Sequence, residues 1–249
     1  MCGIIGLYHP TENVAGEIYD ALIQVQHRGQ DAAGIAAINK NKLSVHKDLG
    51  VVTEVFKTVE SLDLKGNVGI GHVRYPTAGC SDVSEAQPFH TINPVEICLA
   101  HNGTLTNSDE MREFLLNKKF CKFNTQSDSE VLLNLFAYEL SQTSFEVLES
   151  FHVFSALKEV YKRCEGGFAV AVLVEGVGLV GFRDSNGIRP LVLGKKDDGS
   201  FMVASESSAL SALGYIFESD INPGEAIIIS EQGGVERKTC SENVSHTPC

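Results

Sequence analysis

The order of apolar segments along this chain of 249 residues predicts an α+β fold built in layers. Strand-length apolar runs dominate residues 2–103, helix-like segments cluster within 106–164, and strand-length runs return from 168 onward. A doubly wound parallel sheet would instead require strands and helices to alternate regularly. These observations favour antiparallel sheets with helices packed outside them.

The N-terminal part of the chain is expected to supply several strands and one helix. The segments of strand length and apolar composition are 2–9, 33–39, 43–48, 67–74 and 96–103. Between the first two of these, residues 16–29 repeat apolar side chains at helical spacing. Gly29 offers that helix a C-terminal stop.

The remainder of the chain predicts three helices and a second group of strands. Helices are expected at 106–119, 127–140 and 153–164, the first two opening with cap-type residues and acids. Strands are expected at 168–175, 178–184, 190–195, 201–206 and 224–230. Because no linker or repeat interrupts this order, we expect one domain over residues 1–240 and a polar tail at 241–249.

Composition and charge narrow the possible partners. Hydrophobic residues make up 43% and charged residues 21%, as is ordinary for a soluble protein. The formal charge of −12 and the lack of any Lys/Arg block argue against nucleic acid or an anionic membrane as partner. Seven cysteines without a C-x-x-C pair indicate free thiols in a reducing, cytoplasmic location.

Two motifs imitate cofactor or metal sites. The stretch "GVGLVG" at 176–181 fits a dinucleotide fingerprint by its letters, but a turn-like "FRDSNG" follows it where a helix is needed. Cys98 and His101 have a metal-like spacing, yet on a strand they would point to opposite faces. We therefore expect neither a nucleotide cofactor nor a metal site.

Cys2 is the main candidate for chemistry. A small residue at position 2 favours removal of the initiator methionine, which would leave a thiol and a free α-amine on one residue. The α-amine has a reference pKa of about 7.7–8.0, close to that of a useful general base. Nucleophile and base would then share one residue, as in N-terminal threonine nucleophiles. The alternative is a Cys–His dyad that uses His27, His72 or His101.

Three further positions allow a structural and a functional interpretation. Asn102-Gly103 is either a hairpin turn or a pair of donors for an oxyanion. Arg74, at a strand end before a long loop, is either solvated or a fork for a substrate carboxylate. Asp128 is either a helix cap or the partner of an ammonium group.

Taken together, the motifs resemble one family closely. They are "MCGIIG", "VQHRGQDAAG", "GIGHVRYPTAG", "SEAQPF", "LAHNG", "TQSDSE", "FRDSNGIRPLVLG", "VASES" and "PGEAI", spread over nearly the whole chain. The chain resembles the glutaminase domain of amidophosphoribosyltransferase, a class II glutamine amidotransferase. This resemblance implies an N-terminal-nucleophile hydrolase fold, a four-layer αββα sandwich of two antiparallel sheets between helices.

The resemblance also implies a reaction and roles for named residues. Cys2 would attack the amide of L-glutamine with its own α-amine as base, and the products would be glutamate and ammonia. The implied roles are oxyanion binding for Asn102 and Gly103, carboxylate binding for Arg74, and α-amino binding for Asp128. Tyr75 and Thr77, in the mobile glutamine loop, are expected to bind substrate, and Arg28 is expected to support the nucleophile.

What the resemblance leaves unmatched concerns the ammonia acceptor. The family's phosphoribosyltransferase domain, with its acidic motif for phosphoribosyl pyrophosphate, has no counterpart in these residues. The expected partner is such a domain or subunit. Any Mg²⁺ would bind there, since glutamine hydrolysis needs no cofactor. The expected role is the first step of de novo purine biosynthesis. The alternatives are a stand-alone glutaminase-like relative and a non-catalytic regulatory module that retains the fold.

Overall fold

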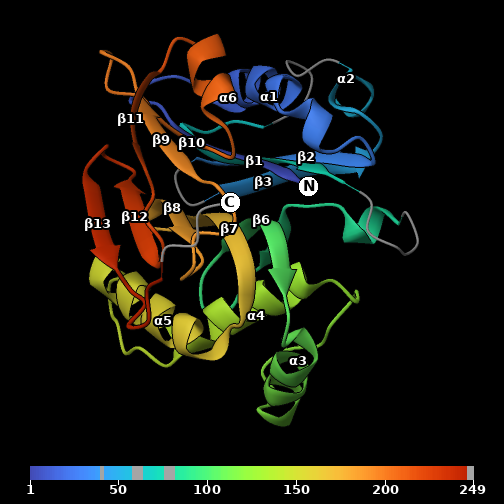
Figure 1. Cartoon of the computed structure of the whole chain (residues 1–249), viewed down its shortest axis with the longest axis vertical. Coiled ribbons are helices and arrows are strands. Elements are labelled where there is room, and N and C mark those ends of the chain that lie inside the picture. The colour runs from blue at the N-terminus through green and yellow to red at the C-terminus, as the bar shows by residue number, and fades with distance from the viewer. Residues whose placement is uncertain (40–41, 58–63, 76–81, 246–249) are drawn as a thin grey trace.

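Four layers, in the order helices, sheet, sheet, helices, make up the computed structural model (Figure 1). The structure describes residues 1–39, 42–57, 64–75 and 82–245. Neighbouring strands pair antiparallel throughout the registers of both sheets. The predicted αββα sandwich is therefore confirmed.

The first sheet has seven strands and carries the N-terminus near its centre. In spatial order they are β11 (Ile216–Asp220), β9 (Val192–Lys195), β10 (Phe201–Ala204), β1 (Gly3–Tyr8), β4 (Val68–Arg74), β2 (Ala32–Asn39) and β3 (Lys42–Leu49). Helices α1 (Ala15–Gln24), α2 (Val52–Val55) and α6 (Ser207–Ala212) pack against it. Because β1 and β4 are antiparallel, Gly3 pairs with Val73, which places Cys2 beside the end of β4.

The second sheet has six strands and is covered by the longer helices. Its order is β13 (Val235–Thr239), β12 (Glu225–Ser230), β8 (Gly178–Arg183), β7 (Gly166–Val174), β6 (Ile97–Leu105) and β5 (Phe89–Thr91). Helices α4 (Asp128–Ser141) and α5 (Ser150–Arg163) lie on it, and α3 (Ser108–Asn117) packs against α4. The motif at 176–181 forms a turn and the start of β8, and it does not open a helix as a dinucleotide fingerprint would.

Alternation along β1 explains how one strand serves two cores. Ile5 and Leu7 pack against the α1 side, whereas Ile4 and Tyr8 pack between the two sheets. A side chain at Gly71 of β4 would place its Cβ 2.6 Å from Ile18 of α1, so only glycine permits this close approach. The central strand is thus held on both faces, and its first residues are fixed with it.

Sequence and structure differ at several element boundaries. The single helix expected over 16–29 is wrong at its end, because α1 stops at Gln24 and a 3₁₀ turn, Gln26–Arg28, follows. The edge strands β5, β11 and β13 and the short helices α2 and α6 escaped prediction because they are short or largely exposed. At the C-terminal side, Ser245 N–H donates to Ser185 O, so this part of the tail lies against the turn after β8.

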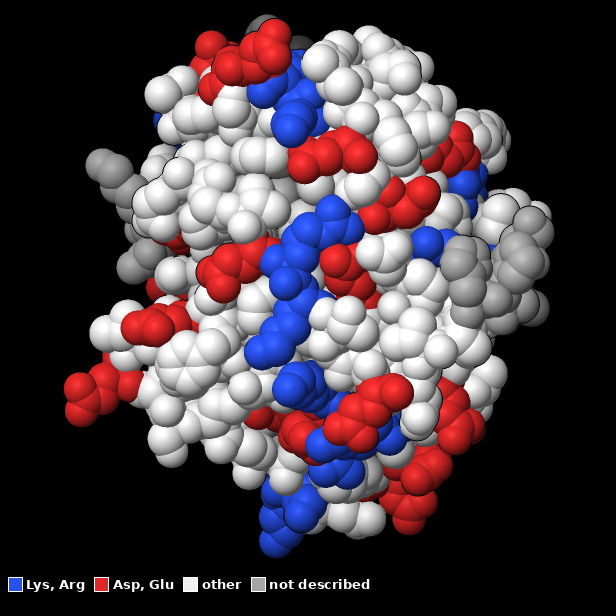
Figure 2. Space-filling model, turned by 60° about the vertical axis from the view of Figure 1, so that its left-hand side comes forward, with Lys and Arg blue, Asp and Glu red and all other residues white. Residues whose placement is uncertain are grey.

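Within the described ranges, no helix combines the length and apolar character needed to cross a membrane. On the face turned forward in Figure 2, Lys and Arg side chains form a narrow band with acidic side chains on both sides. On this face, positive charge is therefore not gathered into a broad patch.

Candidate functional site

A cleft of about 670 Å³ opens where β1, β4, β6 and α4 meet. Most of the residues predicted to be functional line it, namely Cys2, Arg74, Tyr75, Gly103 and Asp128. They come from segments far apart in sequence, and the antiparallel register brings the segment ends together. Thr77 lies outside the described residues.

Cys2 precedes the first residue of β1 and is partly buried. The backbone N–H of Tyr75 donates to its Sγ at 3.5 Å. Burial raises the pKa of the Cys2 thiol, although the Tyr75 N–H, the N-terminal charge and Arg74 oppose this and Asp128 adds to it. The thiol is therefore largely protonated at neutral pH, and a nucleophilic attack needs a base.

Asn102 and Gly103 lie inside β6 and not in a hairpin turn, so the turn interpretation is wrong. Asn102 is 1% exposed, and its Nδ2 has no hydrogen-bond partner among the described residues. A Cβ at Gly103 would lie 2.2 Å from the carbonyl oxygen of Gly167, so the neighbouring strand excludes any side chain there. An amide left unpaired in a buried place is costly unless a ligand group completes it.

Arg74 ends β4 and is 9% exposed. Its Nη1 donates to Asp31 Oδ2 at 3.0 Å, and its Nη2 lies 3.8 Å from Glu85 Oε2. A Cβ at Gly29 would lie 2.4 Å from the Arg74 carbonyl carbon, so glycine at 29 allows this turn to pass behind Arg74. The guanidinium is thus held in place at the cleft wall, whereas Tyr75 beside it is exposed.

Asp128 is the first residue of α4, which Ser127 caps through the N–H of Ser129. Asp128 Oδ2 accepts from the backbone N–H of Leu105 at 2.9 Å. Its Oδ1 lies 3.8 Å from Nδ1 of His101. Asp128 therefore ties α4 to the end of β6 and presents a negative charge to the cleft, across from the cation at Arg74.

Arg28 contacts the backbone of Cys2, the candidate nucleophile. It is 8% exposed, and its Nε donates to the carbonyl oxygen of Cys2 at 2.9 Å. Its Nη1 donates to Oε1 of Glu206 at 2.6 Å. The sequence indicates Arg28 as a supporting residue but not Glu206. Glu206 belongs to the "VASES" motif, where no local pattern distinguishes it from other acidic residues.

A buried polar network next to the cleft also escaped sequence analysis. Gln87 Nε2 donates to Ser129 Oγ at 3.0 Å, and Gln87 Oε1 accepts from the His101 N–H at 2.7 Å. His101 Nδ1 lies 2.8 Å from the same Ser129 Oγ. This network joins β6 to the start of α4, and its members belong to the quoted "SEAQPF", "LAHNG" and "TQSDSE" motifs.

The histidines of the alternative dyad have other partners. The exposed His27 contacts Glu206 through Nε2, and the buried His72 places Nε2 3.2 Å from the carbonyl of His101. Burial lowers the pKa of His72 to about 3 and lowers that of His101. Among the described contacts of Cys2 Sγ, none is to a histidine nitrogen. The geometry therefore favours a base on Cys2 itself.

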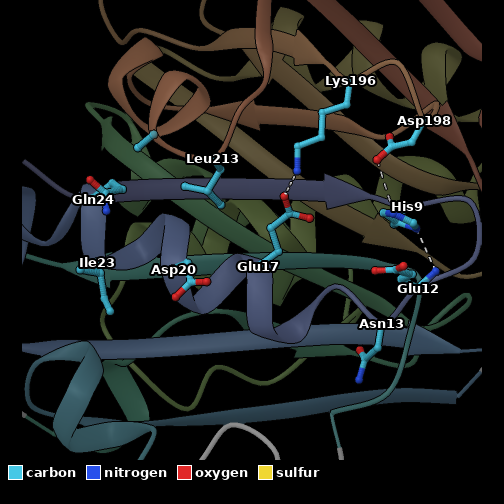
Figure 3. A pocket seen from close by; sticks show the side chains of 11 residues that line it. His9, Glu12, Asn13, Glu17, Asp20, Ile23, Gln24, Lys196, Asp198 and Leu213 are labelled. Atoms are coloured by element: carbon cyan, nitrogen blue, oxygen red, sulfur yellow. Dashed lines mark hydrogen bonds and ion pairs between the residues drawn. The ribbon is translucent and has the colours of Figure 1, made fainter.

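A second cavity, which we call the groove, has a volume of about 720 Å³ and lies over α1 on the far side of the first sheet (Figure 3). Its lining is acidic and includes Glu12, Glu17, Asp20 and Asp198. In the described part of the chain, no group of three or more His, Cys, Asp or Glu side chains is arranged to hold a metal ion.

A cysteine that opens the central strand of a two-sheet αββα sandwich defines an N-terminal-nucleophile hydrolase fold. A family model described as "Glutamine amidotransferase domain" matches residues 72–212, more than half of the chain. The chain belongs to this glutamine amidotransferase family.

Individual relatives agree. The chain is 48% identical over 254 residues to the amidophosphoribosyltransferase of Escherichia coli (strain K12), covering 100% of this chain and 50% of that protein. It is 47% identical over 253 residues to the Pasteurella multocida protein of the same name, with the same coverage. The structure of the glutamine phosphoribosylpyrophosphate amidotransferase from B. subtilis superposes with a TM-score of 0.82 at 32% identity, covering 98% of this chain and 50% of that one. The chain therefore spans about half the length of these relatives.

Proposed function

We propose that this protein hydrolyses the side-chain amide of L-glutamine to glutamate and ammonia. The observation that carries the proposal is the composition of one cleft. It joins a thiol, a cation at Arg74 and an anion at Asp128 beside the unpaired Asn102 amide. Glutamine offers the complementary groups, namely an α-carboxylate, an α-ammonium group and an amide carbonyl. Tyr75 and Thr77 are proposed to complete the substrate contacts.

The proposed reaction proceeds through a thioester. The α-amine of Cys2 takes the thiol proton as sulfur bonds to the amide carbon. The resulting oxyanion accepts hydrogen bonds from Asn102 Nδ2 and the Gly103 N–H. The C–N bond then breaks and the amine passes its proton to the leaving ammonia. Water attacks the thioester, the C–S bond breaks, and glutamate is released with the thiol restored.

This chemistry requires Met1 to be removed, because an N-terminal methionine occupies the proposed base in a peptide bond. Met1 is 59% exposed, so it is accessible for removal. The proposed reaction uses groups of the chain itself and water, and no cofactor takes part in it.

The relatives are twice as long as this chain, which supports a role as one part of a larger activity. We propose that the ammonia passes to phosphoribosyl pyrophosphate on a phosphoribosyltransferase domain or subunit. This would be the first step of de novo purine biosynthesis, in the cytoplasm. Any Mg²⁺ requirement would belong to that second part.

The test compares two preparations of the whole chain, one that begins at Cys2 and one that retains Met1. Intact-mass measurement identifies which form each preparation contains. We expect the first form to release ammonia from glutamine and to be alkylated at Cys2 by a diazoketone analogue of glutamine. We expect the second to fold and to do neither. Equal activity of both forms would support a histidine base, and inactivity of both would support a non-catalytic module.

A further inference from the structure

We infer that Glu206 is a positioning residue for the nucleophile, acting through Arg28 on the peptide group between Cys2 and Gly3. This inference deepens the glutaminase proposal and rests on it. Glu206 does not line the cleft and makes no described contact with the thiol. It is connected to the Cys2 carbonyl by two hydrogen bonds, both of which Arg28 donates.

The need for such a restraint comes from the place of Cys2 at the end of the chain. Cys2 precedes the paired part of β1, so the sheet restrains Gly3 but not the residue before it. Arg28 Nε fixes the carbonyl of Cys2, and the Tyr75 N–H fixes its Sγ. With both ends held, the rotation that would swing the α-amine away from the thiol is restricted.

Arg28 in turn depends on Glu206. A long side chain buried to 8% exposure needs a partner for its charge, and its Nη2 already lacks a hydrogen bond among the described residues. The bond from Nη1 to Glu206 Oε1, at 2.6 Å, is therefore the charge-assisted contact that orients the guanidinium. Without it, the planar group loses the orientation that aims Nε at Cys2.

Glu206 is itself fixed relative to β1 by its neighbour in sequence. Ser205 N–H donates to the carbonyl of Ile4 at 3.0 Å, and Ser205 Oγ accepts from the Ile4 N–H at 2.9 Å. The carboxylate also accepts from Ser208 Oγ at 3.0 Å and contacts His27 Nε2 at 3.0 Å. The start of β1 and the Glu206 carboxylate are thus held in a fixed relation to each other by the hydrogen bonds of Ser205.

The ionisation of Glu206 agrees with this arrangement. Partial burial acts to raise the pKa of Glu206, but hydrogen bonds from Arg28, Ser208 and His27 outweigh it and hold that pKa below its usual range. The group is consequently a full negative charge at the pH where the enzyme would work.

The experiment measures glutaminase kinetics and the rate of Cys2 alkylation in the form that begins at Cys2, with Glu206→Ala, Glu206→Gln and the control Ser208→Ala. Turnover is expressed per Cys2 that the diazoketone can label. We expect Glu206→Ala to lower kcat by about tenfold to a hundredfold with KM little changed, because displaced catalytic groups lose rate more than binding. Glu206→Gln, which keeps an acceptor for Arg28, should retain more activity than Glu206→Ala.

The control separates positioning from folding. Ser208→Ala removes one hydrogen bond from the same carboxylate but leaves the path to Cys2, so its kcat should stay within about twofold. The double variant Arg28→Ala with Glu206→Ala should be no slower than Arg28→Ala alone, because both act through one contact. If Glu206→Ala fails to fold, the isosteric Glu206→Gln decides: it loses the charge-assisted part of the contact with Arg28, so its kcat should still fall below that of wild type, and an unchanged kcat overturns the positioning role.

The outcomes distinguish this inference from the proposal beneath it. Wild-type turnover together with unchanged kcat in the folded Glu206 variants overturns the positioning role alone. Additive losses in the double variant also overturn it. A wild-type protein that begins at Cys2 and hydrolyses no glutamine overturns both proposals.

Discussion

The cleft at Cys2 and the groove over α1 are nearly equal in volume but differ in how their polar groups are satisfied. In the groove, Glu17 pairs with Lys196 and His9 lies beside Asp198 (Figure 3). At the cleft, Nε2 of the lining residue His101 and the buried amide of its neighbour Asn102 have no partner among the described residues. We conclude that buried polar atoms left unpaired around a candidate nucleophile, and not the size of a cavity, indicate where a substrate binds.

The strongest test of this comparison removes the nucleophile. Cys2→Ala should lower glutamine hydrolysis by more than about 10⁴-fold, because no other group in the cleft forms the thioester. Thermal unfolding should change little, since the substitution removes one sulfur atom from a partly buried side chain that precedes the paired part of β1. Ammonia release measured with purified protein checks the change, and residual activity above a tenth of wild type would place the nucleophile elsewhere.

The next test addresses the unpaired amide. Asn102→Ala should lower turnover by roughly a hundredfold or more, about 3–4 kcal/mol of barrier, while glutamine binding is less affected. Steady-state kinetics separate the two effects. An Asn102→Asp variant serves as a control, because it keeps the size of the side chain but offers an acceptor in place of the donor. A rise in KM alone would mean that Asn102 binds the ground state only.

The anionic end of the cleft gives a smaller effect with a different signature. Asp128→Asn should raise the KM for glutamine by about ten- to a hundredfold, because a charged hydrogen bond to the α-ammonium group is lost. The asparagine oxygen can still accept from Leu105 N–H, so the start of α4 should hold. Des-amino glutamine analogues should bind wild type and variant equally, and a preference for wild type would contradict this assignment.

The protonation of Cys2 predicts a pH profile. Because burial raises the thiol pKa, the thiolate is the minor form at neutral pH and gains population as pH rises. In the form that retains Met1, whose Cys2 nitrogen lies in a peptide bond, labelling of Cys2 by iodoacetamide should therefore increase about tenfold per pH unit through pH 8 and continue to rise near pH 9. Peptide mapping measures Cys2 separately from the other thiols. A plateau below pH 8 would instead indicate a stabilised thiolate and revive the histidine dyad.

The smallest expected effect belongs to the groove. Glu17→Gln breaks the ion pair with Lys196, which is partly exposed, and should cost less than about 1 kcal/mol of unfolding free energy. Glutaminase activity should stay within about twofold of wild type. A tenfold loss of glutaminase activity would show that the groove is coupled to the cleft and would contradict the difference described between them.

Much of the fold could be predicted because buried strands and helices have a periodic pattern of apolar residues in the sequence. The core strands β1, β4 and β6 and the helices α4 and α5 were visible as apolar runs and stripes. The edge strands β11 and β13 were not, because most of their residues are exposed and carry no such pattern. The sequence left a hairpin turn open as one interpretation of Asn102-Gly103, because a dipeptide typical of hairpins also suits a close contact between strands.

The sequence by itself determined the class of fold, the family resemblance and the identity of the candidate nucleophile. These depend on local patterns and on motifs that are contiguous in the chain. Only the tertiary structure decided that Arg28 and Glu206 stand behind Cys2, that the histidines have other partners, and that the Asn102 amide is left unpaired. These relations follow from strand order and register, which bring residues 2, 28 and 206 within hydrogen-bond distance and leave Asn102 Nδ2 without a partner, and a linear pattern does not encode them.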